Sequence, residues 1–199
     1  MDHLMEVAYK RFCQDYGLHS MTDALLSIIG SHPFDPGEVA EIVVRCPEVS
    51  TRMIGTIRNP ESVTAAHFSA NFGLALQLVK GAAGIHEYSE ANLWDPQVRE
   101  LAKRIRLEPD EELSPMYPIK MPAHVTVKLK NGKTYEARVD SAKGAPENPL
   151  SNKELDDKFR NLSGTVLLKD RIEEIIDRVR NLDDVSDVGR LARLLVHCN

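Results

Sequence analysis

The sequence predicts an α+β fold in which a small antiparallel sheet with a β-hairpin is backed by several helices. Two alternating strands flank an Asn-Gly turn within residues 124–140. A third run, at residues 39–46, is rich in β-branched side chains and is bounded by prolines. Apolar residues at helical spacing occur both before and after these strands.

Four elements are expected before the hairpin: a buried helix at 22–29, a strand at 39–46, a long helix at 62–80 and a helix from Asp95 to about Arg106. The long helix carries an apolar stripe made of Phe68, Phe72, Ala75, Leu76 and Val79. Gly81 is expected to end it.

The loop length of the hairpin follows from the register of its apolar residues. A two-residue turn would place the apolar side chains of the two strands on opposite faces of the sheet. A three-residue loop at 130–132, with Gly132 in the left-handed conformation, pairs Val127 with Tyr135 and Val125 with Ala137. We therefore predict the three-residue loop.

After the hairpin, Ser151 and Glu154 form a capping box that predicts a helix to about Asn161. Two amphipathic helices are expected at 169–181 and 185–196. This predicts an N-terminal segment at 1–19 that holds candidate site residues, an α+β domain at 20–164 and C-terminal helices at 165–199.

The composition limits the class of protein. The chain has 199 residues, a net charge of −5, 42% hydrophobic and 28% charged residues, as expected for a soluble globular protein. The acidic balance argues against a nucleic-acid surface, and no apolar run is long enough for a membrane span or a signal peptide. Three cysteines without a CxxC pair indicate neither a zinc site nor a disulfide framework. We expect no metal, no membrane and a cytoplasmic location.

Candidate chemistry concentrates near the N-terminus. Lys10, Asp15 and His19 lie within ten residues, and they offer a cation for a carboxylate, a general acid and a general base. The other interpretation is a solvated arm in which the histidine caps a helix. Arg58 either binds a substrate carboxylate through its fork or is an ordinary surface arginine. None of the P-loop, GxGxxG, HExxH or GxSxG motifs occurs.

Several blocks of the sequence resemble the MmgE/PrpD family, in the family's order and spacing. They are KRFCQDYGLHSMTDAL at 10–25, the strand at 39–45, AHFSANFGLALQLVKG at 66–81, DPQVRELAKRI at 95–105, VTVKLKNGKTYEARV at 125–139 and GAPENPLSNKELDDKFRNL at 144–162. The resemblance implies the fold of the family's C-terminal lid domain. The family's larger helical domain has no counterpart in these 199 residues.

The resemblance also implies a function. Family members are lyases, including dehydratases, or isomerases that act on small di- and tricarboxylic acids without a metal or nucleotide cofactor. We accordingly expect a polycarboxylate substrate and a partner chain that carries the helical domain. The alternatives are a non-catalytic module that self-associates as a homodimer, and a truncated product without a function of its own.

The resemblance places Lys10 at the family's active-site lysine, which binds a carboxylate or stabilises negative charge, and makes Arg11 a candidate substrate-binding residue. His19 either belongs to the site or orients the loop. Asp15 stands where decarboxylase-like members have a second histidine. Phe72 stands where they have a tyrosine, and it cannot donate a hydrogen bond. These departures disfavour cis-aconitate decarboxylase activity. His67 is interpreted as an interface histidine. Cys13, beside Lys10, either has a lowered pKa or is a buried, inert thiol, and the inert thiol is the commoner case.

Overall fold

The structure is a computed structural model that describes residues 6–196. The chain divides into two compact units, Met1–Pro149 and Leu150–Asn199. The boundaries expected from the sequence, after residues 19 and 164, stay predictions.

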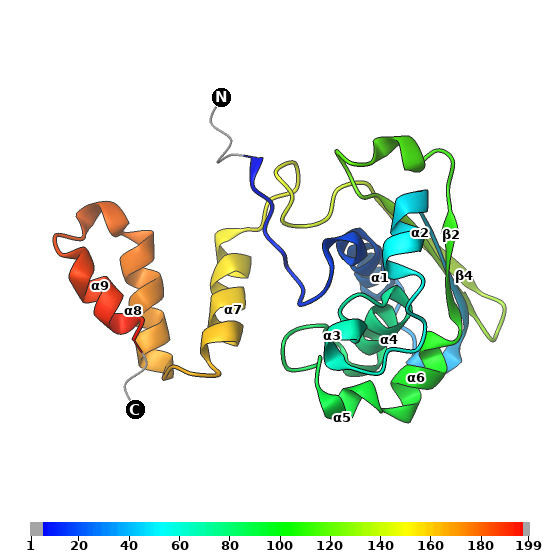
Figure 1. Cartoon of the computed structure of the whole chain (residues 1–199), viewed down its shortest axis with the longest axis horizontal. Coiled ribbons are helices and arrows are strands. Elements are labelled where there is room, and N and C mark those ends of the chain that lie inside the picture. The colour runs from blue at the N-terminus through cyan, green and yellow to red at the C-terminus, as the bar shows by residue number, and fades with distance from the viewer. Residues whose placement is uncertain (1–5, 197–199) are drawn as a thin grey trace. The chain divides into compact units, whose positions relative to one another are not determined.

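The first unit is built on a four-stranded sheet with the order β2-β1-β3-β4 (Figure 1). Its strands are β1 (Val39–Cys46), β2 (Ile105–Pro109), β3 (Ala123–Leu129) and β4 (Thr134–Val139). The β1–β3 and β3–β4 pairs are antiparallel, whereas β2 runs parallel to β1. The α+β class is confirmed, but the sheet is mixed rather than wholly antiparallel.

The parallel strand β2 lies where the sequence pattern predicted the end of a helix. Helix α6 (Pro96–Ala102) begins as expected, with the Asp95 side chain accepting hydrogen bonds from the Gln97 and Val98 amides. It ends early because the chain then joins the sheet, where Ile105 pairs with Ile42. Pairing with a strand about sixty residues away has overridden the local helical pattern.

The predicted long helix is two helices, α3 (Val63–Ala66) and α4 (Ala70–Lys80). Ser69 separates them, because its hydroxyl accepts a hydrogen bond from the Phe72 amide and so caps α4. Phe68 falls in the break and is 45% exposed, so it does not belong to the buried stripe. Phe72 is 2% exposed and lies in the core. Gly81 ends α4 at a φ of 77°, as predicted.

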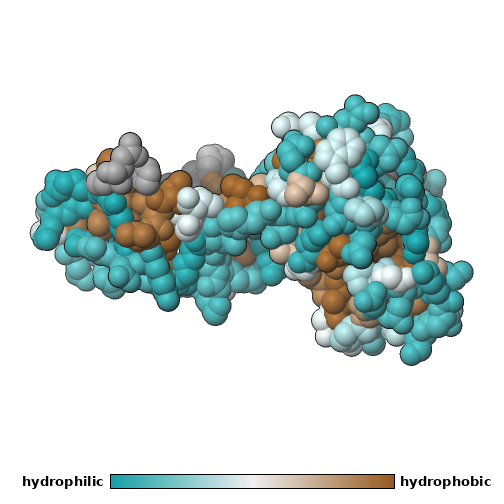
Figure 2. Space-filling model, turned by 90° about the horizontal axis from the view of Figure 1, so that it is seen from below, coloured by the Kyte–Doolittle hydropathy of each residue, from teal (hydrophilic) through white to brown (hydrophobic). Residues whose placement is uncertain are grey.

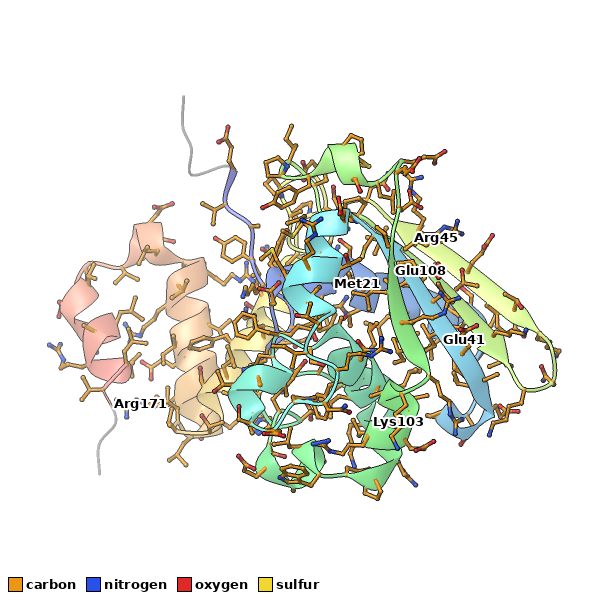
Figure 3. All side chains as sticks on the ribbon, turned by 45° about the vertical axis from the view of Figure 1, so that its right-hand side comes forward. Met21, Glu41, Arg45, Lys103, Glu108 and Arg171 are labelled. Carbon is orange, nitrogen blue, oxygen red and sulfur yellow. The ribbon has the colours of Figure 1, made fainter. Side chains whose placement is uncertain are left out.

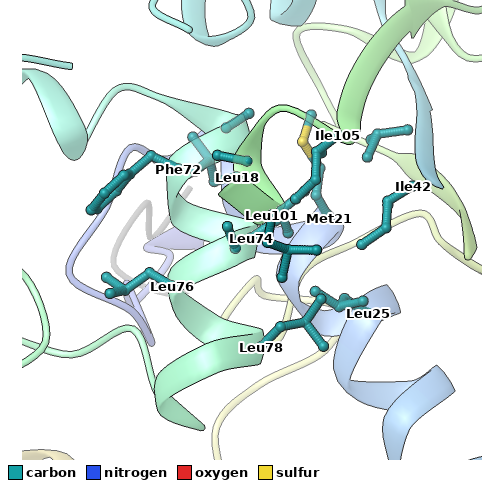
Figure 4. Packing of buried hydrophobic residues seen from close by; sticks show 14 of the residues in the cluster. Leu18, Met21, Leu25, Ile42, Phe72, Leu74, Leu76, Leu78, Leu101 and Ile105 are labelled. Atoms are coloured by element: carbon teal, nitrogen blue, oxygen red, sulfur yellow. The ribbon is translucent and has the colours of Figure 1, made fainter. Parts of the chain in front are cut away.

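Helices α1 (His19–Ser31) and α4 pack against one another, with contacts from α1 to β3 and β4 and from α4 to β2. The core between them includes Leu18, Met21, Leu25, Ile42, Leu74 and Ile105 (Figure 4). The unit is completed by α2 (Glu48–Ile54), α5 (Glu90–Leu93) and the short 3-10 helices η2 (Tyr16–Leu18), η3 (Pro36–Glu38) and η4 (Ser114–Met116).

The strands place charged side chains at alternate positions. Glu41 and Glu108 both pair with Arg106, and Arg45 lies 3.2 Å from His124 Nδ1 (Figure 3). The intervening side chains, such as Ile42 and Val44, are fully buried. One face of the sheet is therefore apolar and the other polar.

The hairpin has the predicted three-residue loop. Val127 pairs with Tyr135 and Val125 with Ala137, and Gly132 has a φ of 86°. The Gly132 amide donates to the Leu129 carbonyl at 2.9 Å. The positive φ explains why the loop requires glycine.

The second unit consists of α7 (Asn152–Ser163), α8 (Lys169–Arg180), the 3-10 helix η5 (Leu182–Asp184) and α9 (Val188–Leu194). The predicted capping box of Ser151 and Glu154 is present at the start of α7. Helix α9 begins later than expected, because Asp187 caps it by accepting a hydrogen bond from the Gly189 amide. Within residues 6–196, no helix is both long and apolar enough to cross a bilayer.

Candidate functional site

The segment that precedes α1, residues 9–15, is bonded through its backbone to three distant parts of the first unit. Figure 1 shows this segment in dark blue, leading into α1. Its three backbone hydrogen bonds run from the Tyr9 amide to the Gly144 carbonyl (2.8 Å), from the Cys13 amide to the Ala83 carbonyl (3.1 Å) and from the Asp15 amide to the His67 carbonyl (2.9 Å). The segment is therefore an ordered part of the unit rather than a solvated arm.

Within the segment, the buried side chain of Gln14 connects to two other parts of the unit. Its amide nitrogen donates to Thr22 Oγ1 at 2.7 Å, and its amide oxygen accepts from the Tyr88 hydroxyl at 3.0 Å. Thr22 in turn donates to the Leu18 carbonyl. Gly73 on α4 makes room for this network, since a Cβ there would lie 2.8 Å from the Tyr88 hydroxyl oxygen. A buried, satisfied network of this kind fixes the position of the segment.

Lys10, Cys13 and His67 lie next to this network. Lys10 Nζ donates to the Gln14 carbonyl at 3.2 Å, and Cys13 Sγ lies 3.8 Å from His67 Nε2. The His67 ring packs on the Tyr88 ring with 4.3 Å between centroids. We call Lys10, Cys13, Gln14, His67 and Tyr88 the Lys10 cluster.

The electrostatics of the Lys10 cluster favour a neutral imidazole and a protonated phenol. Burial, and then the charge of Lys10, lower the pKa of His67 below its usual value. Burial, with a smaller contribution from Cys13, raises the pKa of Tyr88. At neutral pH His67 can therefore accept a proton, Tyr88 donates a hydrogen bond, and Lys10 supplies a positive charge.

Two of the predicted site residues serve the segment itself in this structure. The Asp15 carboxylate caps η2 by accepting a hydrogen bond from the Gly17 amide at 2.8 Å. His19 is 0% exposed, and its ring lies 5.3 Å from that of Phe12 and 5.2 Å from that of Tyr16. This burial agrees with the interpretation in which His19 orients the loop.

The two predicted substrate-binding arginines lie in different places. Arg11 forms a 3.2 Å ion pair with Asp23, and the other oxygen of Asp23 accepts from the Lys143 amide. Arg58 donates to the carbonyl of Ile105 at 3.4 Å, at the start of β2. Arg11 thus adjoins the Lys10 cluster, whereas the contacts of Arg58 are with the sheet.

Gln14, His67 and Tyr88 are the cluster members to which sequence reasoning assigned no site role. His67 was interpreted as an interface histidine and Tyr88 received no role. Both reach the segment from positions more than fifty residues further along the chain. The sequence signal that could have found them is weak: a serine that caps α4 two residues after His67, and a tyrosine in the loop after Gly81.

No group of three or more histidine, cysteine, aspartate or glutamate side chains within residues 6–196 is arranged to hold a metal ion. The Lys10 cluster instead offers a cation, a proton acceptor and hydrogen-bond donors. Such groups suit the binding of an anion and the movement of a proton next to it.

The fold and the cluster thus define an α+β domain in which a lysine of the docked N-terminal segment acts on an imidazole from the turn between α3 and α4. The chain belongs to the MmgE/PrpD family, since the family's "MmgE/PrpD C-terminal domain" matches residues 12–184. That range includes His67 and Tyr88 and begins two residues after Lys10.

Known relatives agree with this family. The chain is 30% identical to the cis-aconitate decarboxylase of Homo sapiens over 197 residues, which is 96% of this chain and 40% of the relative. Identity to the Mus musculus cis-aconitate decarboxylase is 29%, over 96% of this chain and 39% of the relative. For the cis-aconitate decarboxylase of Aspergillus terreus it is 27%, over 89% and 38%. The chain therefore spans about two fifths of the length of these relatives.

Proposed function

We propose that this chain forms the lid part of a cofactor-independent lyase or isomerase that acts on small di- or tricarboxylic acids. The helical part of the site would come from a domain like the remaining three fifths of the relatives. Support comes from the family match and from relatives whose names describe a lyase acting on a tricarboxylic acid. The observation that carries the proposal is the Lys10 cluster, in which a lysine and a neutral imidazole occur together.

In this proposal each member of the cluster has a separate role. Lys10 binds a substrate carboxylate and stabilises the negative charge that develops when the neighbouring carbon loses a proton. His67 accepts or returns that proton, because its lowered pKa leaves it neutral. Gln14 and Tyr88 hold the segment in place, and Arg11 adds positive charge nearby.

We favour elimination of water, or an isomerisation, over loss of CO2. The resemblance places Asp15 and Phe72 where decarboxylase-like members have a histidine and a tyrosine. The Asp15 carboxylate is engaged as a helix cap and Phe72 is buried in the core. Neither offers the proton donor that such members place there.

The proposal is tested by supplying the helical region and following exchange at carbon. The chain, combined with that region, is incubated in deuterated water with a panel of di- and tricarboxylates. We expect deuterium to appear next to a carboxylate without release of CO2, accompanied by loss or gain of water for a dehydratase and by neither for an isomerase. Release of CO2 from cis-aconitate would refute the preference for a dehydratase or isomerase. No reaction and no binding with any polycarboxylate would refute the whole proposal.

Binding is checked separately by thermal unfolding. A ligand at a hundredfold its dissociation constant should stabilise the protein by about 2.7 kcal/mol. Lys10→Met should abolish this stabilisation and Lys10→Arg should retain part of it. Lys103→Met is the matched control, since Lys103 is an exposed residue that pairs with Glu100. Equal loss in the Lys103 variant would remove Lys10 from the site.

A second candidate function is self-association without catalysis. The second unit exposes many large apolar side chains: Leu162, Val166, Leu168, Val179, Leu182, Val188, Leu195 and Val196. Figure 2 shows hydrophobic patches on its surface. Sedimentation of the chain by itself tests this function. A homodimer that binds no polycarboxylate would favour it over the enzyme, and a monomer would exclude it.

A further inference from the structure

The Lys10 cluster contains a thiol next to an imidazole. Cys13 Sγ lies 3.8 Å from His67 Nε2, and both side chains are partly exposed. A nucleophilic atom within reach of a base is the arrangement that activates cysteine. The proposed lyase or isomerase reaction has no use for this thiol.

Both members of the pair are held in position. The Cys13 amide is bonded to the Ala83 carbonyl, which fixes the backbone that carries the thiol. The His67 ring packs on Tyr88, whose hydroxyl is bonded to the buried Gln14. The approach of sulfur to nitrogen is therefore set by the fold rather than by two mobile surface side chains.

The surroundings of the pair keep the base in its neutral form. The pKa of His67 is lowered, so its imidazole is neutral and can take the thiol proton. The charge of Lys10 also acts on His67. A nearby ammonium group favours a thiolate over a thiol and attracts anions.

The chain supplies its own contrast in Cys46. This thiol is fully buried at the end of β1, and burial, with the charge of Asp110, raises its pKa to about 12. Its thiol points to the Glu108 carbonyl oxygen, which lies 3.9 Å from the sulfur. Cys46 has the properties of an inert structural cysteine.

We propose that Cys13 is a reactive thiol and the site at which small carbon electrophiles, above all anionic ones, modify this protein, with His67 as the base. In the reaction the S–H bond breaks and the proton moves to His67 Nε2. The sulfur electron pair forms a bond to the electrophilic carbon, and the leaving group departs with the electrons of its own bond. With iodoacetate the leaving group is iodide. The inference does not depend on the proposed enzymatic function.

The test measures alkylation at each cysteine separately. The chain is treated with iodoacetate or iodoacetamide for increasing times, and peptides containing Cys13 and Cys46 are quantified by mass spectrometry. Cys198→Ser serves as the background, because Cys198 lies outside the described residues. The same reaction in urea at the same pH gives the rate of each thiol in the unfolded chain.

We expect Cys13 to react roughly tenfold faster in the native chain than in urea, and Cys46 to be strongly protected. His67→Gln should slow Cys13 by roughly tenfold and leave Cys46 protected. Lys10→Gln should lower the rate with iodoacetate more than the rate with neutral iodoacetamide.

Three results would overturn parts of the proposal. A native Cys13 that reacts no faster than in urea is not activated. If the Cys13 rate is unchanged in His67→Gln, His67 is not the base. If Lys10→Gln lowers the rates with iodoacetate and iodoacetamide equally, Lys10 does not make the thiol selective for anions. Rapid labelling of Cys46 in a variant would show that the variant has unfolded. In that case the activation of Cys13 is judged from its rate in the native chain against its rate in urea, because that comparison needs no substitution.

Discussion

The two units of this chain are stabilised in different ways. The first has a continuous core in which α1 and α4 pack on a four-stranded sheet. In the second, the buried apolar residues of α8 are Ile172 and Ile175, and charged side chains connect the helices. The first unit is therefore the more rigid of the two, and the candidate site lies on it.

The same difference explains how a short N-terminal segment can be held in place. Backbone groups of residues 9–15 find partners in the first unit because the loops there are themselves fixed by the core. Ion pairs between exposed helices are worth little, because water competes for the charges and long side chains lose entropy. We therefore expect substitutions in the first unit to change the free energy of unfolding more than substitutions in the second, and to affect a larger part of the structure.

The largest effect is expected from Leu74→Ala, which opens a cavity in the core of the first unit. Leu74 is fully buried on α4. Its truncation should lower the free energy of unfolding by about 3–4 kcal/mol, measured by urea denaturation. Leu168→Ala is the control in the second unit, where the side chain is 82% exposed, and it should change stability by about 0.5 kcal/mol or less. Similar losses in both variants would contradict the comparison.

Gly73→Ala is expected to cost less, about 1–2 kcal/mol. The added Cβ would lie 2.8 Å from both the Leu18 Cδ2 atom and the Tyr88 hydroxyl oxygen. Alanine favours a helix by about 1 kcal/mol over glycine, and this gain offsets part of the clash. Thermal unfolding measures the sum.

The matched control for Gly73 is Gly30→Ala on α1, where nothing lies within 4 Å of the added Cβ. That variant should be more stable than the native chain, by about 0.5–1 kcal/mol. Tyr88→Phe in the Gly73→Ala background should recover part of the loss, since it removes the clashing oxygen. If the Gly73→Ala variant is as stable as Gly30→Ala, the side chains of the Lys10 cluster must move to accommodate the added methyl group without cost.

Ser151→Ala removes the capping box of α7 and should cost about 1 kcal/mol. Hydrogen exchange should show the loss within residues 150–196, because these helices form a compact unit of their own. Ser69→Ala removes the corresponding cap of α4, where the hydroxyl is buried, and should cost more. A larger effect at Ser151 than at Ser69 would reverse the ranking of the two units.

The smallest effect is expected from Glu173→Gln. Glu173 bonds Arg160 through both carboxylate oxygens, at 2.7 and 2.8 Å, and this contact lowers its pKa. A lowered pKa gives stability that is present above the usual glutamate range and is lost as pH falls through the folded value. The variant should therefore be slightly less stable at pH 7, by less than Ser151→Ala, and equal to the native chain in strong acid. High salt should also remove the difference, and a difference that persists in salt would show a buried pair.

Local chemistry made several elements predictable. The β1 strand, the three-residue hairpin loop and the capping box of α7 depend on residues close together in sequence, and each was predicted. The α3–α4 break was missed although its signal is local, since Ser69 is a good N-cap inside an otherwise helical pattern. Strand β2 was missed because its partner β1 lies about sixty residues earlier.

The candidate site was predictable in part. The resemblance singled out Lys10, and the structure bonds this residue to the Gln14 carbonyl and brings its charge to bear on His67. The contacts of His67 and Tyr88 with the segment join residues that are far apart in sequence, so no spacing rule could reveal them. Asp15 and His19 have helix-capping and packing contacts that also require the folded chain.

The break between α3 and α4 separates two tasks that a continuous helix would have joined. In an unbroken helix the His67 carbonyl would bond the amide of Asn71, but here it accepts the Asp15 amide of the docked segment. The turn that carries His67 is thus anchored to the segment, while α4 is anchored to the core. Because the Ser69 cap begins α4 independently of His67, changes at residues 67–68 should alter the position of the imidazole more than the packing of α4. The position of the His67 side chain can in this way change while the hydrophobic core around α4 stays the same.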